Sequence, residues 1–167
     1  MMTKSEKIIA HIQNLIVNVD KIAGKQFHLS DNSGKPLFEI KHQPKEGNHS
    51  LSLKNGDMAV CTFVLSDHSG DKWLDKWLKV GQVSKNSNQR YKYDHYKTDK
   101  GSTLVRSLIN DPENCSLSES NVGDWIKNNC DRYDVWIDSS RFSNPKIVLN
   151  FVEGLLQYNL NPRYEGK

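Results

Sequence analysis

The first segment of the chain has an apolar face with the period of a helix. Its apolar residues recur every three or four positions: Ile8, Ile9, Ile12, Leu15, Ile16, Val19, Ile22 and Ala23. Thr3 and Glu6 have the spacing of a capping box, and Gly24 suits the position after a helix end. The pattern predicts an amphipathic helix over 3–23 that packs on the core, with contact to a second copy or a partner as the alternative role.

The segment from residue 27 to residue 52 alternates turn signals with short apolar runs. Turn-forming residues cluster at 31–34 and 45–48, and apolar runs occupy 37–40 and 51–53. We therefore expect two or three short strands here. The histidines of this segment lack the spacing of a metal motif and are expected on the surface: His28, His42 and His49.

Three further strands are predicted downstream. The run 58–65 is apolar and rich in β-branched residues, which favours a central strand, and 77–81 returns as its hairpin partner after a long tip. Trp73 and Trp77 are expected to cover the edge of the core. Over 131–138, the alternation of Tyr133, Val135 and Ile137, with Trp136 between them, predicts another strand.

Three helices complete the pattern, over 102–110, 118–129 and 145–158. The first and last have these residues on the faces expected to be buried: Leu104, Val105, Leu108 and Ile109, then Ile147, Val148, Phe151, Val152, Leu155 and Leu156. The sequence predicts a small α+β domain over 55–167, with a central antiparallel sheet of about three strands flanked by helices. An N-terminal helix and β-hairpin extension, 1–54, precedes it.

The composition of the chain indicates its cellular compartment more clearly than its function. The chain has 167 residues, 26% of them charged, and a formal net charge of +3, which is only a weak indication of an anionic partner. Cys61, Cys115 and Cys130 are odd in number and widely spaced, so neither a disulfide framework nor a zinc site is expected. No apolar run approaches ~20 residues, and a signal-peptide pattern is lacking, so we expect a cytoplasmic protein without a membrane partner.

Positive charge is concentrated between residues 79 and 100. This stretch interleaves cations with aromatic residues: Lys79, Lys85, Arg90, Tyr91, Lys92, Tyr93, His95, Tyr96, Lys97 and Lys100, against only Asp94 and Asp99. Cations neutralise phosphates, and tyrosines stack on bases or donate hydrogen bonds to phosphate oxygens. We expect a strand, turn and basic helix that bring Arg90 against a nucleic-acid phosphate. A solvated basic helix beside core tyrosines is the alternative.

A specific pattern favours nucleic acid. A strand ending in Lys79-Val80-Gly81 leads through the polar turn 84–88 to Gln89-Arg90-Tyr91 and then His95-Tyr96. Near the C-terminus, the run 148–156 contains Glu153 and is followed by Asn159-Leu160-Asn161-Pro162. Together these motifs, over roughly 55–167, resemble the GIY-YIG nuclease family, in particular a bacterial subgroup with a KVG…NSN.R…HY segment and an NPRYEG-like tail.

The resemblance implies a Mg²⁺-dependent endonuclease, with Mn²⁺ as a substitute metal and DNA as the expected nucleic acid. Arg90 would hold the scissile phosphate, since a guanidinium offers a bidentate fork that stays charged. Glu153 would ligate the metal. Further contacts with nucleic acid are expected from Lys85, Asn88, Lys92, Lys97, Lys100 and Asn161. A double-strand cut from single-site subunits would require a homodimer.

The chain differs from the family at the two positions of the tyrosines that give the family its name. The triplet Ala59-Val60-Cys61 occupies the first position, and Lys79 replaces the tyrosine of the second. The second tyrosine is often assigned as the general base, so here Lys79, Tyr91, His95 or Tyr96 would have to activate the water.

Two other functions are also compatible with the sequence. A domain that has lost catalysis would bind nucleic acid without cutting it. Alternatively, a protein-binding or inhibitor role would use Trp73, Trp77 and the hairpin tip as its contact surface. A retained acid in a phosphate cleft favours a metal site over pure binding, because a bare carboxylate repels the substrate.

Overall fold

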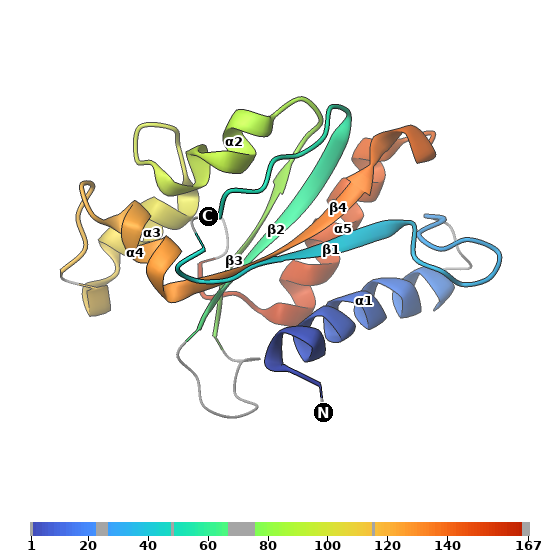
Figure 1. Cartoon of the computed structure of the whole chain (residues 1–167), viewed down its shortest axis with the longest axis horizontal. Coiled ribbons are helices and arrows are strands. Elements are labelled where there is room, and N and C mark those ends of the chain that lie inside the picture. The colour runs from blue at the N-terminus through green and yellow to red at the C-terminus, as the bar shows by residue number, and fades with distance from the viewer. Residues whose placement is uncertain (1, 23–26, 48, 67–75, 115, 165–167) are drawn as a thin grey trace.

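The structure is a computed structural model that describes residues 2–22, 27–47, 49–66, 76–114 and 116–164. It is an α+β fold with a four-stranded antiparallel sheet (Figure 1). Its helices and strands, in chain order, are α1 (Lys4–Ile22), β1 (Phe38–Gln43), β2 (Asp57–Leu65), β3 (Trp77–Val83), α2 (Asn88–Lys92), η2 (Asp94–Tyr96), α3 (Thr103–Asn110), η3 (Pro112–Asn114), α4 (Val122–Asn129), β4 (Cys130–Asp138), η4 (Ser139–Arg141) and α5 (Pro145–Leu160).

The strand order is β1-β4-β2-β3, with every pair antiparallel. The predicted central strand and its hairpin partner are confirmed as β2 and β3. The N-terminal segment contributes β1, which pairs with β4 from Phe38 opposite Ile137 to Gln43 opposite Arg132. The segment expected to be an extension therefore supplies an edge strand of the same sheet, and the boundary expected near residue 54 falls within one shared core.

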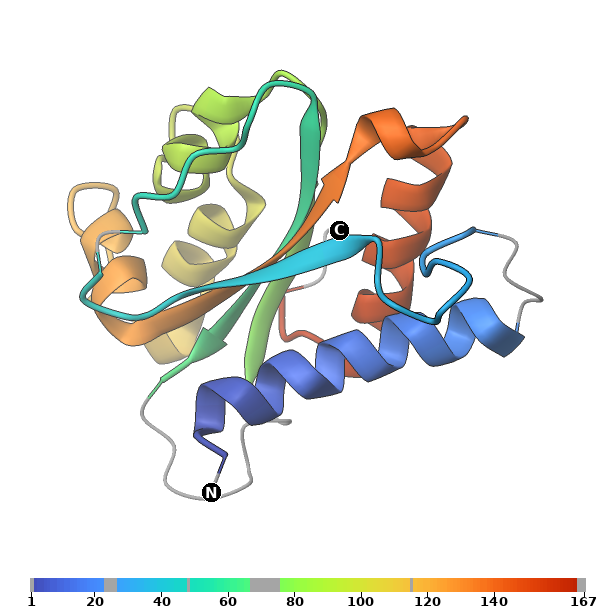
Figure 2. The same cartoon turned by 45° about the vertical axis from the view of Figure 1, so that its right-hand side comes forward.

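One face of the sheet is covered by α1 and α5 (Figure 2). The capping box of α1 is confirmed, because the Thr3 backbone N–H donates to Glu6 Oε2 at 2.7 Å and the Glu6 N–H donates to Thr3 Oγ1 at 3.2 Å. The expected burial of Ile22 is wrong, since it is 85% exposed. Asp20 is buried instead, and its carboxylate accepts the backbone N–H groups of Phe27 and Leu29, which fixes the chain as it leaves the helix.

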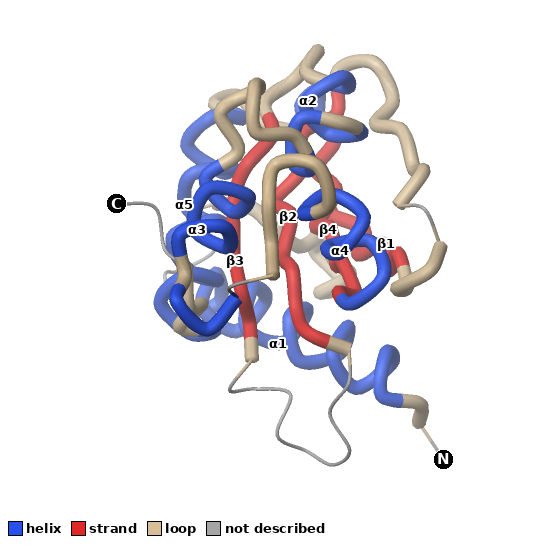
Figure 3. Tube along the Cα trace, turned by 90° about the vertical axis from the view of Figure 1, so that its left-hand side faces the viewer, coloured by secondary structure: helices blue, strands red, loops and turns tan. Residues whose placement is uncertain are grey.

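The opposite face is covered by α2, η2, α3 and α4 (Figure 3). Ser102 caps α3 by accepting the Val105 N–H, and Leu104, Val105 and Leu108 are buried as predicted. Gly123 allows α4 to approach η2, because a Cβ there would lie 2.6 Å from the Tyr96 carbonyl oxygen. The basic helix expected after β3 is short, five residues of α2 followed by the 3-10 turn of η2.

Several local expectations are corrected. The run 51–53 is not a strand, because side chains satisfy its backbone: the Leu51 N–H donates to Gln43 Oε1 and the Leu53 N–H to Asn88 Oδ1. His49 is buried rather than on the surface. Trp77 lies within the core rather than at its edge, while Trp73, Gly24, Cys115 and the hairpin tip lie outside the described residues.

Helix α5 is confirmed, with a buried stripe rotated from the predicted one. Ile147 is 52% exposed, whereas Leu149 and Leu160 are buried with Val148, Val152 and Leu156. After the helix, the backbone N–H groups of Arg163 and Tyr164 donate to the carbonyls of Trp77 and Leu78, so the tail runs beside the start of β3. Within the described part of the chain, none of the helices has the length and apolarity to cross a membrane.

Candidate nucleic-acid interface

A groove with a volume of about 540 Å³ lies beside the edge strand β3, between α2 and α5. It is lined by Lys79, Val80, Gly81, Gln82, Ser84, Arg90, Thr103, Lys146, Glu153 and Gln157. A narrower recess of about 50 Å³ adjoins the groove and shares five of these residues, Lys79, Gly81, Gln82, Arg90 and Thr103. Groove and recess together form one continuous surface, which we call the phosphate groove.

Strand β3 positions side chains toward both sides of the groove. Successive residues of a strand point to opposite faces, so Lys79 and Gly81 face the α2 side and Gln82 faces the α5 side. At Gly81 an added Cβ would meet nothing within 4 Å, so the missing side chain leaves open space in both parts of the groove. Lys79 is only 8% exposed and reaches the groove from within the fold.

Arg90 is exposed on α2 because the next residue, Tyr91, packs in the core and fixes the orientation of the helix. Tyr91 is fully buried beneath the helix, and adjacent helical residues point about 100° apart, so Arg90 is exposed at the groove. The turn before α2 contains Asn86 with a φ of 63°, a left-handed conformation that asparagine tolerates well. The strand, turn and helix expected around Arg90 are thus present.

Glu153 enters the groove from α5, next to the buried Val152. Its side chain is half-buried, and its Oε2 accepts a hydrogen bond of 2.8 Å from Gln82 Nε2. Lys146 and Gln157 line the groove from the same helix. The wider groove therefore combines three cationic side chains, Lys79, Arg90 and Lys146, with the carboxylate of Glu153, and the recess adds Lys100 and Asp94.

His95 lies in the recess with a buried ring nitrogen. Its Nε2 has no hydrogen-bond partner among the residues that the structure describes, and its ring contacts Phe63 edge-on at 5.7 Å between centroids. Burial, followed by the charges of Arg132 and Arg90, lowers the pKa of His95 well below 6.5. The imidazole is therefore neutral at pH 7. Asp94 Oδ1 is likewise buried without a partner in the described chain, and Asp94 lines the same recess.

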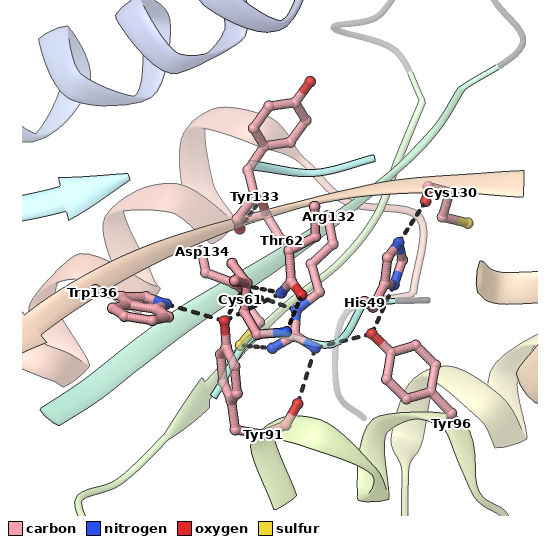
Figure 4. A network of polar contacts seen from close by, with 12 residues as sticks. His49, Cys61, Thr62, Tyr91, Tyr96, Cys130, Arg132, Tyr133, Asp134 and Trp136 are labelled. Carbon is pink, nitrogen blue, oxygen red and sulfur yellow. Dashed lines mark hydrogen bonds and ion pairs between the residues drawn. The ribbon is translucent and has the colours of Figure 1, made fainter. Parts of the chain in front are cut away.

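Tyr91 and Tyr96 belong to a different centre, a buried network behind α2 (Figure 4). The Tyr91 hydroxyl donates to Asp134 Oδ2 at 2.6 Å, and the Tyr96 hydroxyl accepts from Arg132 NH1 at 2.9 Å. Burial raises the pKa of Tyr91 and raises that of Tyr96 to about 12. Neither residue lines the phosphate groove. These tyrosines bind the elements of the fold together.

Arg132 is the centre of this network and is fully buried. Its Nε donates to Asp134 Oδ1 at 2.8 Å, its NH1 also donates to the Tyr91 carbonyl at 3.0 Å, and its NH2 lies 3.2 Å from Cys61 Sγ. The guanidinium stacks 4.2 Å from the centroid of the Tyr91 ring. Because the buried charge is paired and its donors are satisfied, the network locks α2 and η2 onto β2 and β4.

His49 joins the network as a neutral acceptor. Its Nε2 lies 3.1 Å from the Cys130 carbonyl, which can only accept, so Nε2 carries the proton and Nδ1 accepts from the Tyr96 hydroxyl at 2.8 Å. Burial, with the charge of Arg132 next, lowers the pKa of His49 to about 4. Protonation of His49 would prevent Nδ1 from accepting the hydrogen bond of the Tyr96 hydroxyl, and it would place a second cation near Arg132.

Stability is accordingly expected to depend on pH through His49. In the unfolded chain, histidine titrates near 6.5, so between that pH and about 4 the unfolded state binds more protons. The free energy of unfolding should therefore fall as the pH drops from 6.5 to 4, by roughly 3 kcal/mol from this group. Urea titrations at stepped pH would measure it. His49→Gln should reduce this dependence and leave the part that comes from the buried His95, whose pKa is also lowered, and an unchanged slope in that variant would contradict the assignment.

The other residues expected to contact nucleic acid are dispersed. Lys100 lines the recess, and Lys85 is exposed in the turn before α2. Asn88 caps the Leu53 backbone, and Asn161 is the left-handed C-cap of α5, outside the phosphate groove. Two lysines lie over η2 and α4 in a separate hollow: Lys92 and Lys97.

Several residues that line the groove were not predicted as site residues from the sequence: Gln82, Ser84, Thr103, Lys146 and Gln157. The open space left by the missing side chain of Gly81 was not predicted either. Gln82 directly follows the Lys79-Val80-Gly81 triplet, and Lys146 follows the helix-starting Pro145, but neither position carries a chemical signal on its own. No family model, no curated protein and no solved structure matches the chain.

Proposed function

We propose that the protein is a Mg²⁺-dependent endonuclease that cleaves a phosphodiester bond of nucleic acid, with DNA as the expected substrate, in the phosphate groove. One observation carries the proposal: Arg90, far from Glu153 in sequence, lines the same open groove with it, together with Lys79 and Lys146. A phosphodiester carries one negative charge and needs cations around its oxygens as charge grows during cleavage.

Arg90 is suited to hold the scissile phosphate. It is exposed at the groove, and a guanidinium can donate two parallel hydrogen bonds to phosphate oxygens. Lys79 lies deeper in the groove, and its ammonium acts as a point charge rather than a fork. Lys146 lines the same groove from the first turn of α5 and would meet a neighbouring phosphate.

The donor set around Glu153 fits Mg²⁺. This ion commonly keeps several of its waters and binds through one or two carboxylates and the substrate phosphate. Glu153 would hold it, with the Gln82 amide orienting the carboxylate through the 2.8 Å hydrogen bond. Within the described residues no group of three or more His, Cys, Asp and Glu side chains gathers, which is compatible with an ion held by Glu153, water and the substrate phosphate. Bound Mg²⁺ would supply charge stabilisation at the leaving oxygen.

His95 is the best-placed group to accept the proton of the attacking water. Its Nε2 has no partner in the described structure, and in the tautomer that carries the proton on Nδ1 this nitrogen would offer a lone pair in the recess that Arg90 and Lys79 also line. A bound phosphate would raise the pKa of His95 from its low value in the free protein, because a nearby anion favours imidazolium. In this scheme the water oxygen forms the new bond to phosphorus, His95 takes its proton, and the bond from phosphorus to the leaving oxygen breaks.

Nucleic-acid binding without cleavage is the second candidate, and one observation favours it. Cys61, where the family would have its first tyrosine, is fully buried beside Arg132, and burial raises its pKa. It therefore cannot take the place of a groove tyrosine. A protein-interaction role based on the tryptophans gains no support from Trp77, because that side chain is buried in the core.

A cleavage assay separates these candidates. Supercoiled plasmid, single-stranded DNA and RNA would be incubated with the protein in Mg²⁺, Mn²⁺ or EDTA, beside Arg90→Ala and the control Lys21→Ala, which removes an equal charge from an exposed site on α1. We expect metal-dependent cleavage that Arg90→Ala loses and Lys21→Ala retains. Salt-sensitive binding without cleavage would establish the second candidate, and neither binding nor cleavage would refute both.

Blocking the groove at Gly81 should remove binding without unfolding the protein. Valine suits a strand, and a Cβ at this position meets no atom within 4 Å, so Gly81→Val should change the free energy of unfolding by less than about 1 kcal/mol. Its side chain would occupy the space for the phosphate, and we expect nucleic-acid affinity to fall at least about tenfold.

The matched control for this prediction is Gly154→Ala. Gly154 also has no atom within 4 Å of an added Cβ, but it does not line the groove. Affinity measured by fluorescence anisotropy should therefore stay at the wild-type value. Full binding by a folded Gly81→Val protein would show that nucleic acid binds elsewhere.

A further inference from the structure

A second hollow lies on the other side of η2 from the recess. It has a volume of about 220 Å³, and the residues that line it include Lys92, Tyr93, Lys97, Glu119, Asp124 and Lys127. The segment 90–97 separates the two sites: Arg90, Asp94 and His95 line the phosphate groove, whereas Lys92, Tyr93 and Lys97 line this hollow. A ligand that continues from the groove across this short segment would reach it.

Tyr93 makes this hollow chemically different from the groove. Its side chain is 51% exposed, although Tyr91 and Tyr96 on either side are buried. Lys92 Nζ lies 5.6 Å from the centroid of the Tyr93 ring, and Lys127 Nζ lies 5.4 Å from that of Tyr96. An exposed aromatic ring beside lysines is the combination that binds an unstacked base and its flanking phosphates.

The acidic residues of the hollow favour a nucleotide over an isolated phosphate. Glu119 and Asp124 line it together with three lysines, Lys92, Lys97 and Lys127. The carboxylates would weaken the binding of a bare phosphate, but they can accept hydrogen bonds from the exocyclic amino groups of bases. The lysines can meet the sugar-phosphate backbone on either side of such a base.

We propose that Tyr93 is a stacking platform for an unpaired base next to the cleavage site, so that the preferred substrate has a single-stranded segment beside its duplex. This inference rests on the proposed function, because the nucleic acid that would stack on Tyr93 is the same molecule that would bind in the phosphate groove. It identifies the substrate class as an overhang, flap or branch. In a continuous duplex the bases stay stacked on one another and cannot lie on the Tyr93 ring.

The test compares three labelled DNA probes of one sequence in EDTA: a blunt duplex, the duplex with a single-stranded overhang, and the duplex with an overhang of abasic nucleotides. The abasic overhang keeps its phosphates and loses only the bases. We expect wild-type protein to bind the normal overhang roughly 5- to 150-fold more tightly than the abasic one, the range for stacking one base. Tyr93→Ala should lose this difference and bind the blunt duplex as wild type does.

Two further variants make the test specific to the ring. Tyr93→Phe keeps an aromatic face and should retain the overhang preference. Tyr158→Ala removes an even more exposed tyrosine, 87% exposed on α5, and should change nothing. Equal binding of normal and abasic overhangs by the wild type, or a preference that survives in Tyr93→Ala, would overturn the platform. If the blunt duplex binds normally in that case, the groove proposal stands, whereas failure to bind any probe would refute both.

Discussion

Replacing Glu153 with Gln is expected to reduce cleavage by roughly 100- to 1000-fold, the loss typical when one stabiliser of transition-state charge is removed. The amide cannot provide the negative charge that holds Mg²⁺, but it keeps the size of the side chain and can still meet Gln82. Binding measured in EDTA should be equal to wild type or tighter, because an anionic group has been removed from the groove. The variant should thus separate catalysis from binding.

The control for this prediction is Glu39→Gln. Glu39 is an exposed acid that pairs with Lys41 on β1, the strand at the opposite edge of the sheet from β3. It should cleave at the wild-type rate. Equal cleavage by Glu153→Gln and wild type would exclude Glu153 as the metal ligand, whatever the binding data show.

Replacing Arg132 with Met is expected to have the largest effect on stability, a loss of about 3–5 kcal/mol in the free energy of unfolding. The substitution leaves the Asp134 carboxylate buried without its ion pair, and it removes the donors to the Tyr91 carbonyl and the Tyr96 hydroxyl. Since the whole site is fully buried, water cannot replace these partners without opening the fold. Urea denaturation would measure the loss.

Arg141→Met provides a matched comparison. Arg141 also pairs with an aspartate, Asp138, at 3.3 Å, but both side chains are about half exposed. Exposed ion pairs contribute about 0–1 kcal/mol, so this variant should lie close to wild type. An Arg132→Met protein no less stable than Arg141→Met would show that the buried network does not hold α2 and η2 in place.

Local patterns predicted the elements that bury a regular apolar face. Helix α1, helix α5 and strand β2 follow directly from the spacing of their apolar residues and from the signals at their ends. Strand β1 shows the limit of this reasoning. The apolar run 37–40 did predict a short strand, but its continuation over Lys41 and His42 and its pairing with β4, which begins at Cys130, were not predictable from local patterns.

The buried network could not be inferred from the sequence. Arg132 and Asp134 are two residues apart in a strand, a pattern that normally indicates a solvent-exposed face. Their burial depends on α2 and η2 covering that face of β4, which local periodicity does not encode. For the same reason, Tyr91 and Tyr96 looked like candidates for proton transfer, although they hydrogen-bond within the network.

The groove was only partly predictable. Arg90 and Glu153 were selected by their likeness to a family pattern, and the structure independently places both in one groove. Gln82, Thr103 and Lys146 became visible only when β3, α3 and α5 were placed together. The neutral state of His95, whose buried Nε2 has no partner among the described residues, likewise depends on packing against Phe63 and on the charge of Arg132.

We propose that nucleic acid binds in the groove beside β3, and mapping the contact on the protein tests this most directly. Amide NMR spectra of ¹⁵N-labelled protein would be recorded in EDTA while a short DNA is added. We predict the largest shifts at Gly81, Arg90, Thr103 and the side-chain amide of Gln82, all of which line the groove. Shifts confined to α1 and β1, with these four signals unmoved, would contradict the account.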